Sequence, residues 1–326
     1  MPTDPKLLLT PEEVEAVRAE IRGIIQAEGI PATQIAREAG IAYGTFSSWL
    51  GGTYAGRNDR IAAEARKWQA TRQVRAETQA MAPAAPRFVA TPSAELYLAL
   101  FARAQHLPDF AVLVGLPGTG KSSAACHYTR NTPNVFKVMA NPMMGSPRSV
   151  LDEIGRLTGT GGAGGLTPHA LQRAIVQKLR GIGALIMVDE AQFLRSEALD
   201  QLRTLHDEAE VGLVLIGNPS IFGRLEGGSR SAEFAQLFSR VGLRHLRKEA
   251  TKGDVDALLD AWGLQDEPAR KMLHAIARKP GALRGMTKTL KLAHMLAAAE
   301  HAGTPGEQHI REAYGMISAT DAKAAA

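Results

Sequence analysis

The stretch Gly115-Leu116-Pro117-Gly118-Thr119-Gly120-Lys121-Ser122 decides how the middle of this chain folds. It fits the pattern G-x-x-x-x-G-K-[ST], in which backbone N–H groups surround phosphates. An apolar run at 109–114 precedes it, as a buried parallel strand requires, and the residues that follow can begin a helix. We therefore expect residues 115–123, Ser123 included, to bind ATP. Lys121 would reach the β- and γ-phosphates, and the Ser122 hydroxyl would hold Mg²⁺.

Two later apolar runs end in polar residues. Residues 183–188 lead into Asp189-Glu190, and residues 211–217 lead into Asn218. In parallel sheets, ligands bind at the carboxyl ends of the strands. We expect Asp189 to hold Mg²⁺, directly or through water, and Glu190 to activate the attacking water. Asn218 is expected to hydrogen-bond that water or the γ-phosphate. With a further strand at 134–140, the alternation of strands and helices predicts an α/β fold with a parallel sheet.

Composition excludes several classes of protein. The chain has 326 residues, a net charge of +5 and one cysteine, Cys126. One cysteine excludes a disulfide framework and a thiolate zinc site. No apolar run is as long as a membrane span, and the acidic start is unlike a signal peptide, so we expect a cytoplasmic protein without a membrane role. The basic charge is compatible with nucleic acid as a partner but does not require it.

The first part of the chain has a helix-turn-helix pattern at 31–50, with Gly40 in the turn. The second helix would expose four polar side chains that are candidates for DNA contact: Tyr43, Thr45, Ser47 and Ser48. A small helical domain that binds protein is the other interpretation. The basic residues of the helix that starts near Asn58 fit a solvated face as well as a phosphate-contacting one.

These observations divide the chain into a small all-α helix-turn-helix domain at 1–76, a linker rich in proline and alanine at 77–92, an α/β core at 93–246 and a C-terminal helical domain at 247–326. A helix at 234–240 would end in Arg240. Helices are expected at roughly 253–262, 267–278, 281–302 and 307–318, the third beginning at Gly281-Ala282-Leu283-Arg284.

The order of these motifs resembles the AAA+ ATPases, a class with a P-loop parallel sheet and a helical lid. The resemblance implies ATPase activity, with Asn218 as sensor 1 and Arg284 as sensor 2, in contact with the nucleotide. It also implies an arginine finger that acts on the neighbouring subunit's nucleotide, and Arg240 is the candidate. Arg230 and Arg244 are competing candidates, and a structural ion pair is a further explanation of Arg240.

A narrower resemblance, to the MuB family of phage transposition proteins, covers nearly the whole chain. It is carried by residues 86–89, the phosphate loop, and residues 212–218, 233–240 and 279–284. It implies an ATP-dependent protein that binds double-stranded DNA without sequence preference, assembles on it as a helical homo-oligomer, and recruits and stimulates a transposase. Hydrolysis would dismantle the filament and give target immunity. Phage or mobile-element coding and the bacterial host cytoplasm are further implications.

Non-specific DNA binding needs only cations that face phosphates. Candidates are Lys137 and Arg148, which flank the loop after the second strand, and Arg173. Two alternatives remain open: a helicase-loader-like AAA+ protein, and a helix-turn-helix transcription regulator whose ATPase domain senses nucleotide. The regulator would bind one operator through residues 43–48, whereas the transposition protein would bind unrelated duplexes equally and only with ATP.

Overall fold

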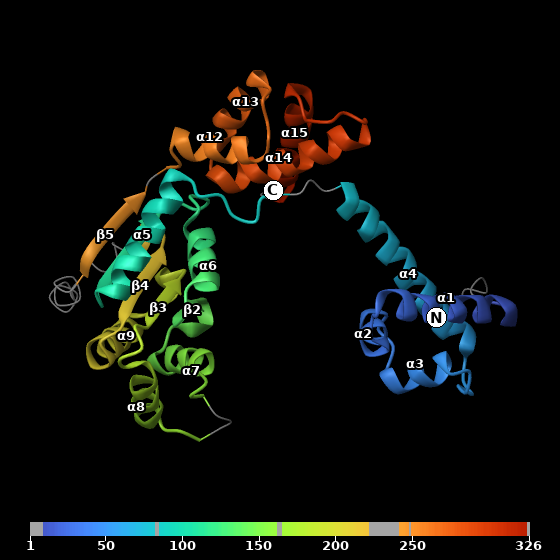
Figure 1. The fold of residues 1–326 in the computed structure, drawn as a ribbon, viewed down its shortest axis with the longest axis horizontal. Helices are drawn as coiled ribbons and strands as arrows, with labels where there is room; N and C mark the ends of the chain where they lie inside the picture. Colours follow the sequence, from blue (N-terminus) through green and yellow to red (C-terminus); the bar gives the residue numbers. More distant parts are fainter. Residues whose placement is uncertain (1–8, 82–84, 162–164, 222–240, 248, 325–326) are drawn as a thin grey trace. The chain divides into compact units, whose positions relative to one another are not determined.

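The structure, a computed structural model, describes residues 9–81, 85–161, 165–221, 241–247 and 249–324. The chain divides into two compact units, Met1–Pro83 and Ala84–Ala326 (Figure 1). None of the helices within these described ranges has the length and apolar character that a membrane crossing requires.

The described residues of the unit Met1–Pro83, 9–81, contain helices and no strand, as expected. Its helices are α1 (Pro11–Glu28), α2 (Ala32–Glu38), α3 (Tyr43–Leu50) and α4 (Asn58–Met81). Gly40 turns the chain between α2 and α3 with a φ of +69°, a conformation that glycine adopts without strain. Phe46 and Trp49 of α3 are fully buried in the shared core. The helix-turn-helix is therefore formed, and α4 continues five residues beyond the expected end of this domain at 76.

The unit Ala84–Ala326 contains a five-stranded sheet. Its strands are β1 (Phe110–Gly115), β2 (Val135–Met139), β3 (Leu185–Asp189), β4 (Gly212–Gly217) and β5 (Val241–Arg247). The order is β2-β3-β4-β1-β5, and every pairing is parallel. The α/β parallel-sheet prediction is confirmed, and the first four strands match the expected runs closely.

The strand β5 is not predicted by the sequence pattern. Its polar residues interrupt the apolar pattern, because among the described strands β5 lies at the edge of the sheet and pairs with β1 alone. The strand nevertheless supports the site, since the Leu116 N–H donates to the Arg247 carbonyl at 3.2 Å. The helix expected at 234–240 lies outside the described residues.

The sheet is covered on both faces, which explains its continuous apolar runs. Alternate residues of each strand face opposite sides: Ala111 and Leu113 pack with α5 (Pro92–His106) and α6 (Lys121–Asn131), whereas Val112 and Val114 belong to the core on the other side. That other core includes α7 (Pro147–Thr158), α8 (Pro168–Leu179) and α9 (Ser196–Ala209). The short 3₁₀ helices η1 (Pro142–Met144) and η2 (Ala191–Phe193) follow β2 and β3.

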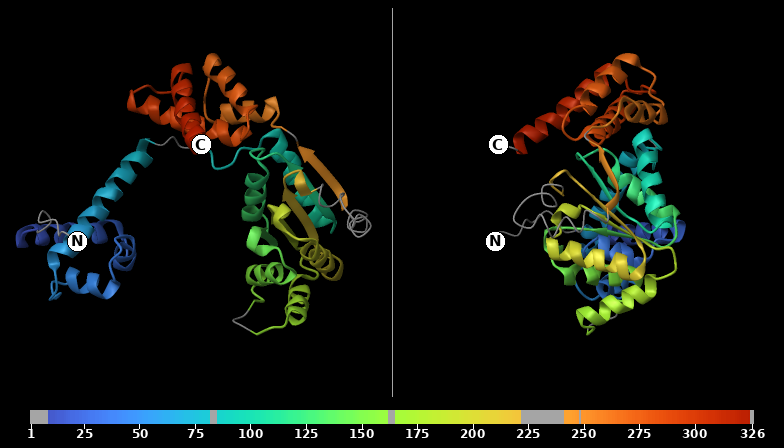
Figure 2. Two further views of the ribbon diagram at one scale, coloured as in Figure 1. Left: turned by 180° about the vertical axis from the view of Figure 1, so that it is seen from behind. Right: turned by 90° about the vertical axis from the view of Figure 1, so that its left-hand side faces the viewer.

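The C-terminal helices form a lid with its own core. They are α12 (Lys252–Ala261), α13 (Glu267–Ala277), α14 (Ala282–Ala299) and α15 (Glu307–Ala324), close to the four expected segments. Leu259, Leu273 and Leu290 are fully buried between them. The helices lie together beyond the end of the sheet where β5 leads into α12 (Figure 2). The lid therefore adjoins the edge at which the predicted site residues gather.

A buried carboxylate fixes the lid to α5. Asp254 of α12 accepts hydrogen bonds from the Ser93 N–H (2.8 Å), the Ser93 hydroxyl (2.7 Å) and the Thr251 N–H (2.8 Å). Burial favours a higher pKa for Asp254, but these hydrogen bonds outweigh it and hold the pKa below its ordinary value. The ionised side chain thus joins the starts of α5 and α12.

Candidate nucleotide site

The phosphate loop joins β1 to α6, as the sequence predicts. Gly118 and Gly120 have φ values of +85° and +86°, which explains why glycine stands at these positions. Within the part of the chain that the structure describes, no side chain caps the start of α6. The N–H groups of its first turn are therefore available to an anion, which the helix dipole also favours.

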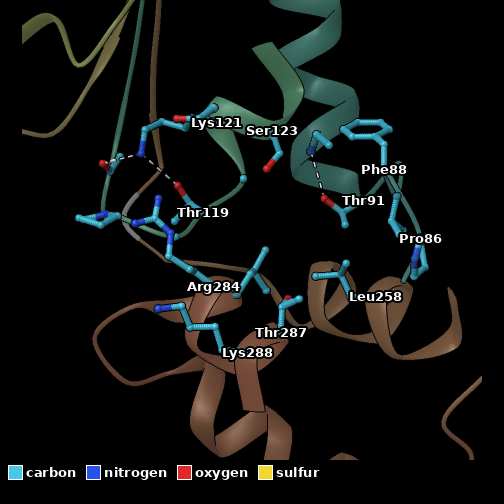
Figure 3. Close-up of a pocket in the computed structure, with 18 of the residues that line it drawn as sticks. Pro86, Phe88, Thr91, Thr119, Lys121, Ser123, Leu258, Arg284, Thr287 and Lys288 are labelled. Atoms are coloured by element: carbon cyan, nitrogen blue, oxygen red, sulfur yellow. Dashed lines mark hydrogen bonds between the residues drawn. The ribbon is translucent and has the colours of Figure 1, made fainter. Parts of the chain in front are cut away.

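Lys121 reaches back into this loop. It is buried, and its ammonium donates to the carbonyls of Gly115 at 2.8 Å and Leu116 at 2.9 Å (Figure 3). Burial lowers the pKa of Lys121, against the opposing effect of Asp189 and Glu190. A phosphate beside this ammonium would stabilise its charged form.

Asp189 ends β3 as a buried carboxylate. Its Oδ1 atom accepts from the Glu190 N–H at 3.1 Å, while its buried Oδ2 atom accepts no hydrogen bond from the residues that the structure describes. The Lys137 ammonium lies 3.2 Å from Oδ2 as an ion pair. Oxygen donors such as this carboxylate and the Ser122 hydroxyl are the ligands that Mg²⁺ prefers. This set of oxygen donors therefore fits a magnesium ion.

The next residues connect β3 to β4. Glu190 has a φ of +56°, and its carboxylate accepts a hydrogen bond from the Gln192 amide. The Gln192 Oε1 atom in turn accepts from the Asn218 N–H at 3.3 Å. The Asn218 Oδ1 atom accepts from the N–H of Ser220 at 2.9 Å and from its hydroxyl at 2.5 Å. The predicted catalytic glutamate and the predicted sensor are thus linked.

A cavity of about 470 Å³ opens between the sheet edge and the lid, a volume within the usual range for small-molecule sites. Thr119, Lys121 and Arg284 lie at one side of it, whereas Pro86, Phe88 and Leu258 lie at the other (Figure 3). Its lining has more basic than acidic residues: Arg87, Lys121, Arg284, Lys288 and Lys291 against Asp189 and Glu190. The cavity therefore suits an anion with an apolar portion.

The lid touches the phosphate loop directly. The Leu283 N–H donates to the Gly118 carbonyl at 3.1 Å, and a Cβ atom on Gly118 would overlap the Gly281 carbonyl. Gly118 is therefore needed for this contact as well as for its positive φ. Because Arg284 follows in the first turn of α14, its place at the cavity depends on this contact.

The cavity brings together most of the predicted nucleotide residues: Gly115, Pro117, Gly118, Thr119, Gly120, Lys121, Ser122, Ser123, Asp189, Glu190, Asn218 and Arg284. Leu116 is not among the lining residues, and its side chain is exposed. Arg240, Arg230 and the side chain of Arg244 lie outside what the structure describes, so the arginine finger remains a prediction.

Sequence reasoning missed the apolar side of the cavity. Residues 85–89, interpreted as linker, contribute to its lining, as do Leu258, Trp262 and Thr287 of the lid region. Phe88 stacks on His127 of α6 with ring centroids 3.8 Å apart. An aromatic residue within a proline-rich stretch was the available signal. No comparable signal marks Leu258 or Thr287, which look like ordinary helical residues.

The candidate DNA-binding residues belong to several different elements of the chain. Tyr43 and Ser47 are exposed on α3, and Thr45 and Ser48 are half-buried. Arg173 is exposed on α8. These residues remain predictions.

The other two candidates have partners within the chain. Arg148 is exposed but pairs with Asp152 at 2.9 Å and donates to the Leu166 carbonyl at 3.0 Å. The Lys137 side chain is only 12% exposed and faces Asp189, a location that favours the nucleotide site over DNA.

Comparison with known protein families supports this arrangement. The family described as "Mu B transposition protein, C terminal" matches residues 239–316, and an AAA domain family matches residues 104–225. The ATP-dependent target DNA activator B of Escherichia phage Mu is 34% identical over 301 residues, covering 92% of this chain and 95% of the phage protein. The Mu-like prophage FluMu DNA transposition protein B of Haemophilus influenzae is 35% identical over 262 residues, covering 80% and 90%.

Among solved structures, the Aeropyrum pernix ORC2 protein, solved as ADPNP-ADP complexes, superposes with a TM-score of 0.54. The alignment covers 72% of this chain and 69% of that chain at 18% identity. At this identity the similarity concerns the fold alone, and it agrees with the AAA+ arrangement of sheet and lid.

Proposed function

The chain belongs to the phage Mu B family of ATP-dependent target DNA activators and is an AAA+ ATPase, and we propose that it assembles with ATP into filaments on DNA and recruits a transposase to them. The observation that carries this proposal is the cavity that joins the phosphate loop, the Asp189-Glu190 edge and Arg284 of the lid. ATP held there would contact both the core and the lid.

The lining of the cavity supports an orientation for ATP. The phosphates would lie at the N-terminus of α6, beside Lys121 and Arg284, where the positive groups concentrate. The base would lie on the apolar side, near Phe88 and Leu258. Ser122 and Asp189 would hold Mg²⁺, which neutralises phosphate charge when it is bound.

Glu190 is the proposed general base for the attacking water, and Asn218 the group that hydrogen-bonds the water or the γ-phosphate. Both line the cavity and follow adjacent strands of the sheet. Arg240 is proposed to act on the nucleotide of a neighbouring copy. Loss of the γ-phosphate would remove its contacts with such groups and weaken the assembly.

The DNA in this proposal is double-stranded and bound without sequence preference, through cations facing phosphates. A filament repeats each contact many times, so a modest charge per copy suffices. Stimulation of a transposase and clearance of DNA near its sites would follow from ATP-dependent assembly and hydrolysis. These activities would take place in the cytoplasm of a bacterial host.

Binding to two unrelated linear duplexes tests the proposal. The protein is measured with ATP, with ADP and without nucleotide, and the same samples are viewed by negative-stain electron microscopy. We expect filaments on both duplexes with ATP only. Tight binding to one duplex, unaffected by nucleotide, would contradict the proposal and favour a helix-turn-helix regulator. A transposase strand-transfer assay with and without the protein then tests the partner.

A further inference from the structure

Gln192 lies between Glu190 and Asn218, and a single amide bonds to both residues. Its Nε2 atom donates to the Glu190 carboxylate, and its Oε1 atom accepts from the Asn218 N–H at 3.3 Å. The side chain is half-buried in η2, directly after β3, and it does not line the cavity. Gln192 therefore connects the ends of β3 and β4 from behind the nucleotide site.

The backbone on both strands accommodates this amide. Glu190 adopts a left-handed conformation, with φ of +56° and ψ of +36°, which is uncommon for a residue other than glycine. The chain then turns at once into η2, which places Gln192 back beside the Glu190 carboxylate. On β4, a Cβ atom at Gly217 would overlap the Gln192 Oε1 atom and the end of the Ile221 side chain. Glycine at 217 thus leaves the space that the amide occupies.

We propose that Gln192 is a positioning residue for ATP hydrolysis, whose amide holds the Glu190 carboxylate toward the attacking water and ties it to the backbone of Asn218. This inference rests on the proposed role of Glu190 as the base. A donor on one carboxylate oxygen restrains the rotation of the side chain and leaves the other oxygen to accept from water. Small displacements of a catalytic group are costly, since about 1 Å can reduce a rate about 100-fold.

The first test is Gln192→Ala, assayed for basal ATP hydrolysis and for ATP affinity. Because Gln192 does not line the cavity, we expect kcat to fall about 10- to 100-fold while the Kd for ATP changes less than about two-fold. The control is Gln172→Ala. Gln172 of α8 also donates to a glutamate, Glu208, at 2.9 Å, but neither of these residues lines the cavity. This variant should hydrolyse ATP at the wild-type rate.

Two further variants test the hydrogen bond that Gln192 donates to Glu190 and the space at Gly217 that its amide occupies. Gln192→Glu keeps an oxygen for the Asn218 N–H but cannot donate to Glu190 when ionised, so its kcat should fall as far as that of Gln192→Ala. Gly217→Ala leaves Gln192 in the chain but displaces its amide, so it should reproduce the loss. The double variant Gly217→Ala/Gln192→Ala should have a kcat only slightly below that of either single variant, because both changes remove the same contact.

Glu190→Gln is measured in parallel, so that this inference and the proposed function can fail separately. A Glu190→Gln protein that hydrolyses ATP normally would remove Glu190 as the base, whatever Gln192 does. If Glu190→Gln is inactive but Gln192→Ala keeps kcat within about two-fold of wild type, the positioning role is wrong. It is also wrong if kcat and ATP affinity of Gln192→Ala fall equally in a protein whose melting temperature has dropped, since that pattern indicates general structural damage.

Discussion

The two units of the chain differ in charge as well as in fold. Residues 1–83 contain ten Lys and Arg and ten Asp and Glu, so the whole net charge of +5 belongs to residues 84–326. The helix-turn-helix is formed, yet its exposed α3 residues are uncharged. Because affinity for DNA comes largely from cations at phosphates, we predict that the ATPase unit supplies both the nucleotide dependence and most of the DNA affinity.

Among the variants proposed here, Lys121→Ala in the ATPase unit should have the largest effect on ATP binding and on ATP-dependent DNA binding. The change removes a buried ammonium from the phosphate loop, so the affinity for ATP should fall about 100-fold or more. ATP-dependent DNA binding should be abolished with it. The control is Lys271→Ala, which changes an exposed lysine of α13 and should bind ATP and DNA as the wild type does. DNA binding by Lys121→Ala at the wild-type level would show that affinity arises elsewhere, as in the helix-turn-helix unit.

The next largest effect, on stability, is expected from Asp254→Ala, which tests whether the lid and the core unfold together. The change leaves the Ser93 and Thr251 N–H groups without their acceptor. We expect the ATPase unit to lose about 2–4 kcal/mol of unfolding free energy. Thermal denaturation should show this loss while the transition of the unit Met1–Pro83 stays unchanged. Asp200→Ala, at an exposed position of α9, should change stability by less than about 0.5 kcal/mol.

The same carboxylate predicts a pH dependence. The pKa of Asp254 is lowered in the folded protein relative to its ordinary value of 3.8. Its contribution to stability is therefore complete above 3.8 and is lost as the pH falls through the lower folded pKa. Acid titrations followed by circular dichroism would measure the free energy of unfolding of wild type and of Asp254→Ala. The difference between the two proteins should disappear below the folded pKa of Asp254. A difference that stays constant in acid would mean that the carboxylate charge is not involved.

A smaller effect is expected from Arg173→Ala. This exposed arginine of α8 is a candidate phosphate contact in the ATPase unit. Its loss should weaken DNA binding about two- to five-fold on every sequence, and should reduce the slope of log K against log salt by about one. Arg311→Ala serves as the control, since Arg311 is exposed on α15 and pairs with Glu307. Equal slopes for Arg173→Ala and wild type would exclude Arg173 as a contact.

The smallest effect is expected from Tyr43→Ala in the helix-turn-helix unit. Tyr43 is 52% exposed at the start of α3, but it carries no charge. DNA affinity should change less than about two-fold, measured on the same duplexes and at the same salt concentration as Arg173→Ala. If affinity fell ten-fold or more on one duplex only, α3 would be a helix that reads sequence, and the helix-turn-helix unit would contribute substantially to DNA binding.

The sequence predicted the fold most reliably where function depends on a continuous stretch of chain. The G-x-x-x-x-G-K-[ST] motif predicts the phosphate loop, apolar runs that end in polar residues predict the Asp189 edge and Asn218, and helical patterns predict the four lid segments. The two failures have different causes. The strand β5 lies at an edge with one partner, so its pattern is mixed, and α4 continues past 76 into residues that read as linker.

By itself, then, the sequence determined most of the elements, β5 excepted, and which residues can meet a phosphate, because those properties depend on local periodicity and on motifs whose members are neighbours in the chain. The tertiary structure decided which side chains from distant parts of the chain come together around the site. It brought Phe88, Leu258 and Arg284 to one cavity, placed Lys137 against Asp189, and set Gln192 between Glu190 and Asn218. These contacts depend on how strands and lid pack, and packing joins residues whose spacing along the chain carries no signal.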